Sequence, residues 1–141
     1  MPRIHIPDQL RRLVIERARG CCEYCLLHQD DAPEPHHVDH LIAIKHGGKT
    51  VILNLALACA RCNRYKGSDL AAIDPAENKP ALLFNPRSQI WSEHFALGGA
   101  LIVGLTPVGR ATVELLRVND DSVVAHRRKL MSKKRYPPHI Q

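Results

Sequence analysis

Two pairs of cysteines with the same short spacing constrain the fold of this 141-residue chain more than any other feature. Two residues separate the thiols within each pair. Such a spacing lets both sulfurs of one tight turn reach a single ion, and two turns supply the four thiolates of a closed tetrahedral zinc site. We therefore predict a structural zinc ion, Zn2+, bound by Cys22, Cys25, Cys59 and Cys62. Cys21 could replace Cys22, but the two-residue spacing favours Cys22.

The composition suits a small domain that a metal ion helps to stabilise. Hydrophobic residues make up 45% of the chain but aromatic residues only 4%, so we expect a modest aliphatic core. Zinc would supply stability that such a core lacks. We divide the chain into a core with its N-terminal helix at residues 1–72 and an extension at residues 73–141.

Local patterns around the cysteines predict two strands and a helix. Apolar residues at helical spacing predict an N-terminal helix over residues 7–19. We expect a strand over residues 37–43 and a turn over 45–49, because Gly47 and Gly48 readily adopt positive φ angles. The chain should return over residues 51–58, irregularly around Asn54 and then extended, and form a short helix over 60–66 with Gly67 as a left-handed cap. The expected fold class is α+β, with a ββα-metal core.

Several motifs in this region occur in a characteristic order. They are Val-Asp-His-Leu-Ile at 38–42, Gly-Gly at 47–48, Asn-Leu-x-Leu-x-Cys-x-x-Cys-Asn at 54–63, and Lys-Gly at 66–67. Over roughly residues 20–68 the chain resembles the HNH nuclease family, in the form that carries a four-cysteine zinc. The resemblance implies the same ββα-metal fold and metal-dependent cleavage of DNA.

The polar residues of these motifs suit hydrolysis of a phosphodiester bond. His40 is the candidate general base, because a neutral imidazole accepts a proton near physiological pH. Asp39 and Asn63 offer hard oxygen ligands for a catalytic Mg2+ or Mn2+ ion. The resemblance implies the same three roles, and it implies that Asn54 braces the loop and orients His40. Neighbours on a regular strand point to opposite faces, so Asp39 and His40 share one site only if the strand ends or twists there.

Other residues near the site allow more than one interpretation. His37 has the strand parity of Asp39 and could be a further ligand, although a phosphate contact or a structural hydrogen bond is the preferred reading. Arg61, Arg64 and Lys66 on the short helix are candidate DNA-binding residues through phosphate contacts. Solvated helix positions would explain each of them equally well.

The extension from residue 73 carries fewer signals. Loop residues at 74–80 precede two or three expected short strands, and Thr106 with Pro107 predicts the start of a helix. A second helix should begin near Asp120 and Asp121 and run into a basic end at 126–135. That end suits either a nucleic-acid contact or simple solubility.

These features favour a metal-dependent DNA endonuclease or nickase acting on double-stranded DNA. The alternative is a zinc-stabilised nucleic-acid-binding module without cleavage activity, for which zinc and basic residues would suffice. A zinc deaminase is excluded, because the His-x-Glu and Pro-Cys-x-x-Cys signature is absent. The net charge of +6 is compatible with a polyanionic partner. The sequence contains no apolar run of membrane-spanning length and no signal-peptide core, so we expect a cytoplasmic protein without a membrane partner.

Overall fold

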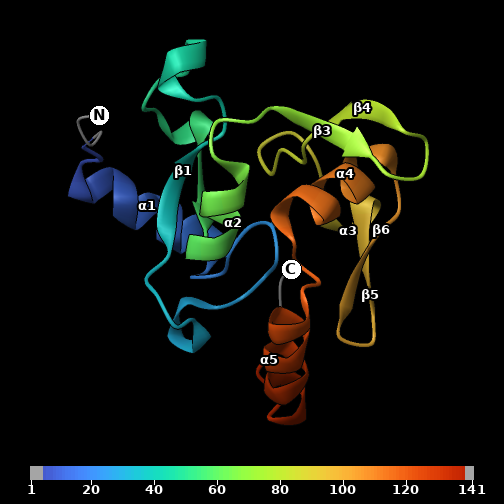
Figure 1. Ribbon diagram of the computed structural model, residues 1–141. Helices are drawn as coiled ribbons and strands as arrows, with labels where there is room; N and C mark the ends of the chain where they lie inside the picture. Colours follow the sequence, from blue (N-terminus) through green and yellow to red (C-terminus); the bar gives the residue numbers. More distant parts are fainter. Residues whose placement is uncertain (1–4, 139–141) are drawn as a thin grey trace.

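In the computed structural model, which describes residues 5–138, the N-terminal half is built around one small hairpin and the helix that follows it (Figure 1). Strand β1 pairs antiparallel with β2, with His37 opposite Ala58 and His40 opposite Leu55. Short 3-10 turns occur at Gln29–Asp31, Ile44–His46 and Ile52–Asn54. The elements of this half are α1 (Asp8–Ala18), β1 (His37–His40), β2 (Leu55–Ala58) and α2 (Ala60–Lys66).

The C-terminal half adds two further hairpins and three helices. Each hairpin consists of two antiparallel strands that are adjacent in sequence. The elements are β3 (Ala71–Asp74), β4 (Lys79–Leu82), α3 (Trp91–His94), β5 (Phe95–Gly98), β6 (Leu101–Gly104), α4 (Pro107–Leu116) and α5 (Asp121–Ser132).

Local sequence signals set the ends of the longer helices. Helix α1 ends where Arg19 adopts the left-handed conformation, and its first turn carries Asp8, a charge that favours a helix N-terminus. Helix α4 begins at Pro107, and the hydroxyl of Thr106 accepts a hydrogen bond from the backbone N–H of Gly109. The predicted starts of α4 and α5 agree with the structure, and α2 has its predicted bounds.

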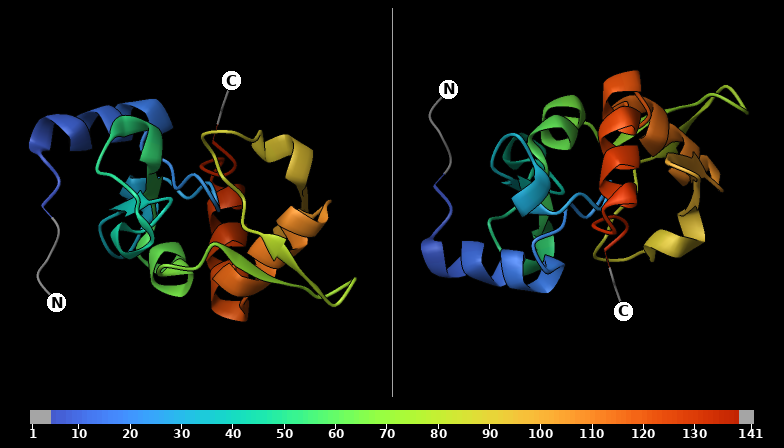
Figure 2. Two further views of the ribbon diagram at one scale, coloured as in Figure 1. Left: turned by 90° about the horizontal axis from the view of Figure 1, so that it is seen from above. Right: turned by 90° about the horizontal axis from the view of Figure 1, so that it is seen from below.

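The two halves share one hydrophobic core. Figure 2 shows the blue-to-green half of the chain beside the yellow-to-red half in both views. The largest buried cluster contains the four paired cysteines and residues of β2 together with Phe84, Phe95, Ile102 and Leu116 of the C-terminal half. A smaller cluster around Val14 packs α1 against β2. The hairpin and α2 are therefore supported from both sides.

Three sequence expectations differ in detail from the structure. Strand β1 stops at His40 instead of reaching residue 43. Gly67 has a positive φ of 51°, but its ψ of −127° lies outside the left-handed helical region. Residues 71–82, expected to include a loop at 74–80, form the β3–β4 hairpin, in which Pro80 pairs with Ile73.

Among the residues described, no helix is long and apolar enough to cross a membrane.

Candidate functional site

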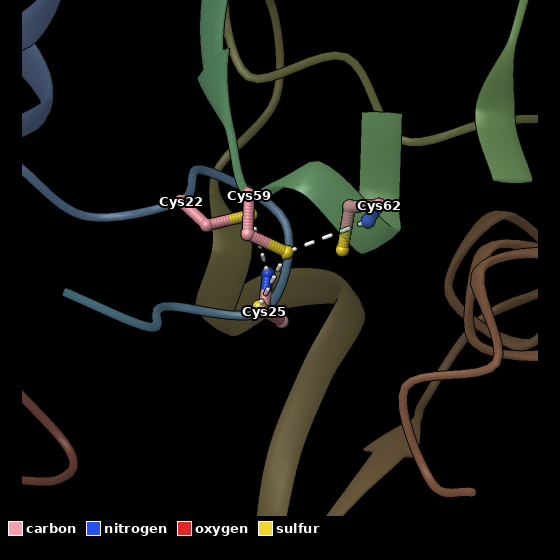
Figure 3. Close-up of side chains that lie close together, drawn as sticks. All are labelled: Cys22, Cys25, Cys59 and Cys62. Atoms are coloured by element: carbon pink, nitrogen blue, oxygen red, sulfur yellow. Dashed lines mark hydrogen bonds between the residues drawn. The ribbon is translucent and has the colours of Figure 1, made fainter. Parts of the chain in front are cut away.

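The two pairs of cysteines lie close together, where the turn after α1 meets the turn between β2 and α2. Their Sγ atoms all lie within 4.8 Å of one another, and all four residues are buried (Figure 3). None of the cysteines forms a disulfide. Four buried thiols at this separation fit a tetrahedral metal site, and sulfur ligands of this number are typical of structural zinc. The structure therefore brings together the four predicted ligands, Cys22, Cys25, Cys59 and Cys62, in positions from which they could hold one metal ion.

Backbone N–H groups support the sulfurs within each turn. The N–H of Cys25 donates to Sγ of Cys22 at 3.5 Å, and the N–H of Cys62 donates to Sγ of Cys59 at 3.4 Å. Cys59 is also the N-cap of α2, so the second turn opens directly into a helix. Such bonds orient thiolates toward a common ion. Cys21 is excluded from the site, because its thiol contacts the carbonyl of Arg19 at 3.6 Å instead.

The carboxylate of Asp39 lies in a closed polar cluster beneath the hairpin. Its Oδ2 atom is 3.1 Å from Nζ of Lys66 and accepts a hydrogen bond of 3.0 Å from the hydroxyl of Tyr24. Only 5% of its side chain is exposed. Burial raises the pKa of Asp39, and the ammonium of Lys66 and the bond from Tyr24 oppose that rise. Burial is the main cause that raises the pKa of Tyr24, and the negative charge of Asp39 raises it further. The hydroxyl therefore stays protonated and acts as a donor.

The imidazole of His40 is half-buried and fixed at one nitrogen. Its Nε2 atom lies 2.9 Å from Oγ1 of Thr50. When Nε2 carries the proton and donates it to Thr50, Nδ1 is the nitrogen that can accept a proton from water. Burial lowers the pKa of His40, which favours the neutral imidazole.

The side chain of Asn54 closes the loop that follows β1. Its Oδ1 accepts from the N–H of Ile42, and its Nδ2 donates to the carbonyls of Ile42 and Lys49, each at 2.9 Å. A Cβ atom at Gly48 would lie 1.7 Å from the carbonyl oxygen of Ile42, so this close approach requires glycine. The loop that follows His40 and carries Thr50 is therefore held by the Asn54 amide and by the close approach of Gly48 to Ile42.

Neither cavity described in the structure, of about 640 and 190 Å3, is lined by Asp39, His40 or Asn63. Asp39 contacts Tyr24 and Lys66, whereas His40 contacts Thr50, as expected for neighbours on a strand. Within residues 5–138, the four cysteines are the only group of three or more His, Cys, Asp or Glu residues positioned for a metal ion.

The second metal site expected from the sequence does not fit this arrangement as it stands. The charge of Asp39 is already balanced by Lys66, the half-buried Asn63 has no described side-chain partner, and His37 is exposed. No step involving a divalent ion can be built on these contacts.

The three candidate DNA contacts on α2 have different surroundings. Arg64 is the most exposed, with 61% of its side chain accessible and Glu34 at 3.8 Å. Arg61 forms an ion pair with Asp120 and lies over the ring of Tyr65. Lys66 is buried against Asp39, so it presents no surface to a phosphate group.

Two residues of the site had no distinctive sequence signal. Tyr24 lies between the first two zinc cysteines, and a tyrosine there gives no hint of a bond to Asp39. Thr50 follows the Gly-Gly turn by two residues, and its contact with His40 depends on how the loop folds back.

A β-hairpin followed by a helix, folded around a four-cysteine metal site, defines this region as a metal-stabilised ββα domain. The family model described as HNH endonuclease matches residues 22–69, and this part of the chain is an HNH-family domain. No curated protein and no solved structure matches the chain.

Proposed function

We propose that the protein is a DNA endonuclease or nickase that hydrolyses phosphodiester bonds with His40 as the general base. The family match over residues 22–69 is the observation that carries this proposal, since those residues include His40 and Asn54. The geometry of His40 supports it. With Nε2 bonded to Thr50 and the pKa lowered by burial, Nδ1 is suited to accept a proton from water.

The proposed substrate is double-stranded DNA. Arg64 is exposed on the same helix as Asn63 and can form charge-assisted bonds with phosphate oxygens without reading sequence. Arg61 would do so only if it released Asp120. The net charge of +6 adds a general attraction for the polyanion.

The proposed cofactors are one structural Zn2+ ion at the four cysteines and one Mg2+ or Mn2+ ion near Asp39 and Asn63. The divalent ion would stabilise negative charge on the phosphate and its leaving oxygen. Asp39 can serve as a ligand only if its ion pair with Lys66 opens.

A binding module without cleavage activity is the second candidate. The burial of Asp39 and its ion pair with Lys66 favour the binding module, because a domain that only binds DNA would not need this carboxylate to be accessible. Zinc, Arg64 and the basic end of α5 would provide all that such a module requires.

A plasmid-nicking assay separates the two candidates. Supercoiled plasmid is incubated with the zinc-loaded protein and Mg2+, Mn2+ or EDTA, and open-circle product is measured. We expect His40→Ala to reduce nicking by about 100-fold or more, because the general base is lost. His46→Ala, which removes an exposed histidine in the adjacent turn, is the matched control and should retain wild-type nicking.

Two outcomes would contradict the nuclease proposal. One is nicking by His40→Ala at the wild-type rate. The other is plasmid binding in a gel-shift assay without nicking in either Mg2+ or Mn2+, which would support the binding module.

A further inference from the structure

The loop that joins β1 to β2, residues 41–54, presents apolar side chains to solvent. Ile42, Ile44, Val51 and Leu53 are all exposed, and Leu53 most of all, at 76%. In Figure 1 this loop projects beyond the end of the β1–β2 hairpin, away from the C-terminal half. An isolated exposed leucine needs no explanation, but four exposed apolar residues in one short loop indicate a contact surface.

The charge of this loop is entirely positive. Lys45 and Lys49 are exposed, and residues 40–68 contain neither Asp nor Glu. Among residues 5–138, neither of these lysines has an acidic partner within ion-pair distance. Positive charge without nearby acids attracts a polyanion, so the loop suits the phosphates of a nucleic acid.

Hydrogen bonds fix the shape in which the loop displays these side chains. The N–H of Gly48 donates to the carbonyl of Ala43 at 3.0 Å, and Nδ2 of Asn54 donates to the carbonyl of Lys49 at 2.9 Å. Leu53 belongs to the 3-10 turn that contains Asn54, so it lies beside Lys49. A rigid backbone thus places an exposed leucine next to an unpaired lysine.

The loop is also adjacent to the candidate general base. Thr50 follows Lys49, and its Oγ1 atom lies 2.9 Å from Nε2 of His40. A duplex with a phosphate at His40 would therefore run across this loop. Lysines in such a position bind phosphates, whereas apolar side chains reach the bases, and proteins use leucine to part stacked base pairs.

We propose that Leu53 is an apolar wedge that enters a groove of duplex DNA and partly unstacks one base step, while Lys45 and Lys49 bind the flanking phosphates. The proposal rests on the function proposed above, which places DNA at His40. A membrane surface suits the loop less well, because its two three-residue turns form no amphipathic helix that could lie in a lipid interface.

A duplex that contains 2-aminopurine tests the wedge, because this base fluoresces more strongly when it is unstacked. The full-length, zinc-loaded protein is titrated without added divalent ions. We expect wild type to raise the fluorescence at saturation. Leu53→Ser should bind about tenfold more weakly, because the burial of a leucine side chain is lost, and should give no rise even when saturated.

Leu82→Ser is the matched control for the wedge. It removes a leucine of β4 that is 68% exposed and lies outside the loop, so it should keep the wild-type affinity and fluorescence. Wild-type protein that saturates the duplex without a rise in fluorescence would overturn the proposal, and so would an undiminished rise with Leu53→Ser.

The salt dependence of duplex affinity tests the phosphate contacts. Lys49→Gln should reduce the slope of log affinity against log salt concentration by about one, because one fewer counterion is released. Lys79→Gln removes an exposed lysine of β4 and should leave the slope unchanged. Wild-type slopes for both Lys45→Gln and Lys49→Gln would remove the phosphate contacts from the proposal.

Two other partners for the loop would give different results. Vesicles of phosphatidylserine and phosphatidylcholine that bind wild type but not Leu53→Ser would assign the loop to a membrane surface. A dimer that forms without DNA in sedimentation velocity, and that Leu53→Ser dissociates, would assign the loop to a second copy of the chain. Either result would overturn the wedge.

None of these measurements requires cleavage, so failure of the wedge can be distinguished from failure of the nuclease proposal. Nicking that depends on His40, with an undiminished fluorescence rise in Leu53→Ser, would retain the nuclease and remove the wedge. Unstacking that depends on Leu53, without nicking by wild type, would retain the wedge in a binding module and remove the nuclease.

Discussion

The amide of Asn54 replaces strand pairing at the point where β1 ends. The N–H of Leu41 still donates to the backbone carbonyl of Asn54. At the next residue, the N–H of Ile42 donates to Oδ1 of Asn54, and the carbonyl of Ile42 accepts from Nδ2 of Asn54. A third bond reaches Lys49 across the Gly-Gly turn. One side chain thus determines where the strand stops and how the loop with Thr50 returns toward His40.

Replacing Asn54 should therefore loosen this loop. Asn54→Ala removes three hydrogen bonds, and we expect it to lower the free energy of unfolding by about 2 kcal/mol. Asn54→Asp should be no better despite its similar shape, because its second oxygen would face the carbonyls of Ile42 and Lys49. Urea unfolding of the three proteins provides the measurement. A wild-type unfolding midpoint for Asn54→Ala would show that the loop does not need the amide.

Among single residues, Lys66 shows most clearly what the sequence did not reveal. A lysine that precedes a glycine at the end of a short helix is ordinarily solvated, and its local sequence is the same whether it is exposed or buried. Its partner Asp39 lies 27 positions earlier in the chain. Only the packing of α2 over the hairpin brings the two together, so the pair could not be inferred from spacing.

At the scale of elements, the two cysteine turns connect the secondary-structure elements of the HNH-family domain. The first follows α1, and the second connects β2 to α2. One metal ion bound to both turns would hold together a four-residue strand pair and a seven-residue helix, elements too short to be stable alone. The local spacing of the cysteines made this part of the fold predictable.

Loss of one thiol should consequently unfold the domain. Binding of structural zinc to such sites is worth about 10 kcal/mol, comparable to the whole stability of a domain this size. We expect Cys59→Ser to lose its cooperative melting transition and its bound zinc. Cys21→Ser is the matched control, because Cys21 is buried beside the site without belonging to it. It should retain zinc and change stability by about 1 kcal/mol.

Circular dichroism melts together with a colorimetric zinc assay would check both variants. An unchanged melting curve for Cys59→Ser would contradict the structural role of the metal. Loss of zinc from Cys21→Ser would place Cys21 in the ligand set.

At the scale of the whole molecule, contacts from the C-terminal half lock the first cysteine turn in place. Trp91 donates its indole N–H to the carbonyl of Tyr24 at 2.8 Å, and Tyr136 donates its hydroxyl to the carbonyl of Cys25 at 2.8 Å. Arg87 forms an ion pair with Glu23. A boundary at residue 72 therefore separates two stretches of sequence that share one core.

A fragment of residues 1–72 should not fold by itself, even with zinc. Its removal from the rest of the chain would expose the buried cluster where Phe84, Phe95 and Leu116 now pack. At roughly 25 cal/mol per Å2, each such side chain contributes about 2 kcal/mol by burial. Size-exclusion chromatography and amide hydrogen exchange of the zinc-loaded fragment would test this. Protected amides and cooperative melting would show instead that residues 1–72 are an independent folding unit.

Features of the fold that depend on residues close together in the sequence were predictable, and features that depend on distant residues were not. Helix starts such as Thr106 with Pro107, and the cysteine turns, depend on residues a few positions apart, and the structure confirms them. The burial of Arg127 was not predictable, because it lies in a basic run that resembles a solvated face. In the fold its guanidinium donates to the carbonyls of Ala100, in the turn between β5 and β6, and Val118, in the turn between α4 and α5. The catalytic and metal-binding roles assigned to the candidate residues remain predictions.

The hydrogen bond between Tyr136 and Cys25 joins residues 111 positions apart, so during synthesis it forms later than the cysteine turns. A ribosome that has released α2 has already exposed all four thiols, whereas the tyrosine lies 74 positions after Cys62 and emerges later. Metal capture by the nascent chain can thus precede the closing of the C-terminal segment over it. During that interval the newly made ion centre is accessible to chaperones, to chelators and to competing metals in a way that the finished protein is not.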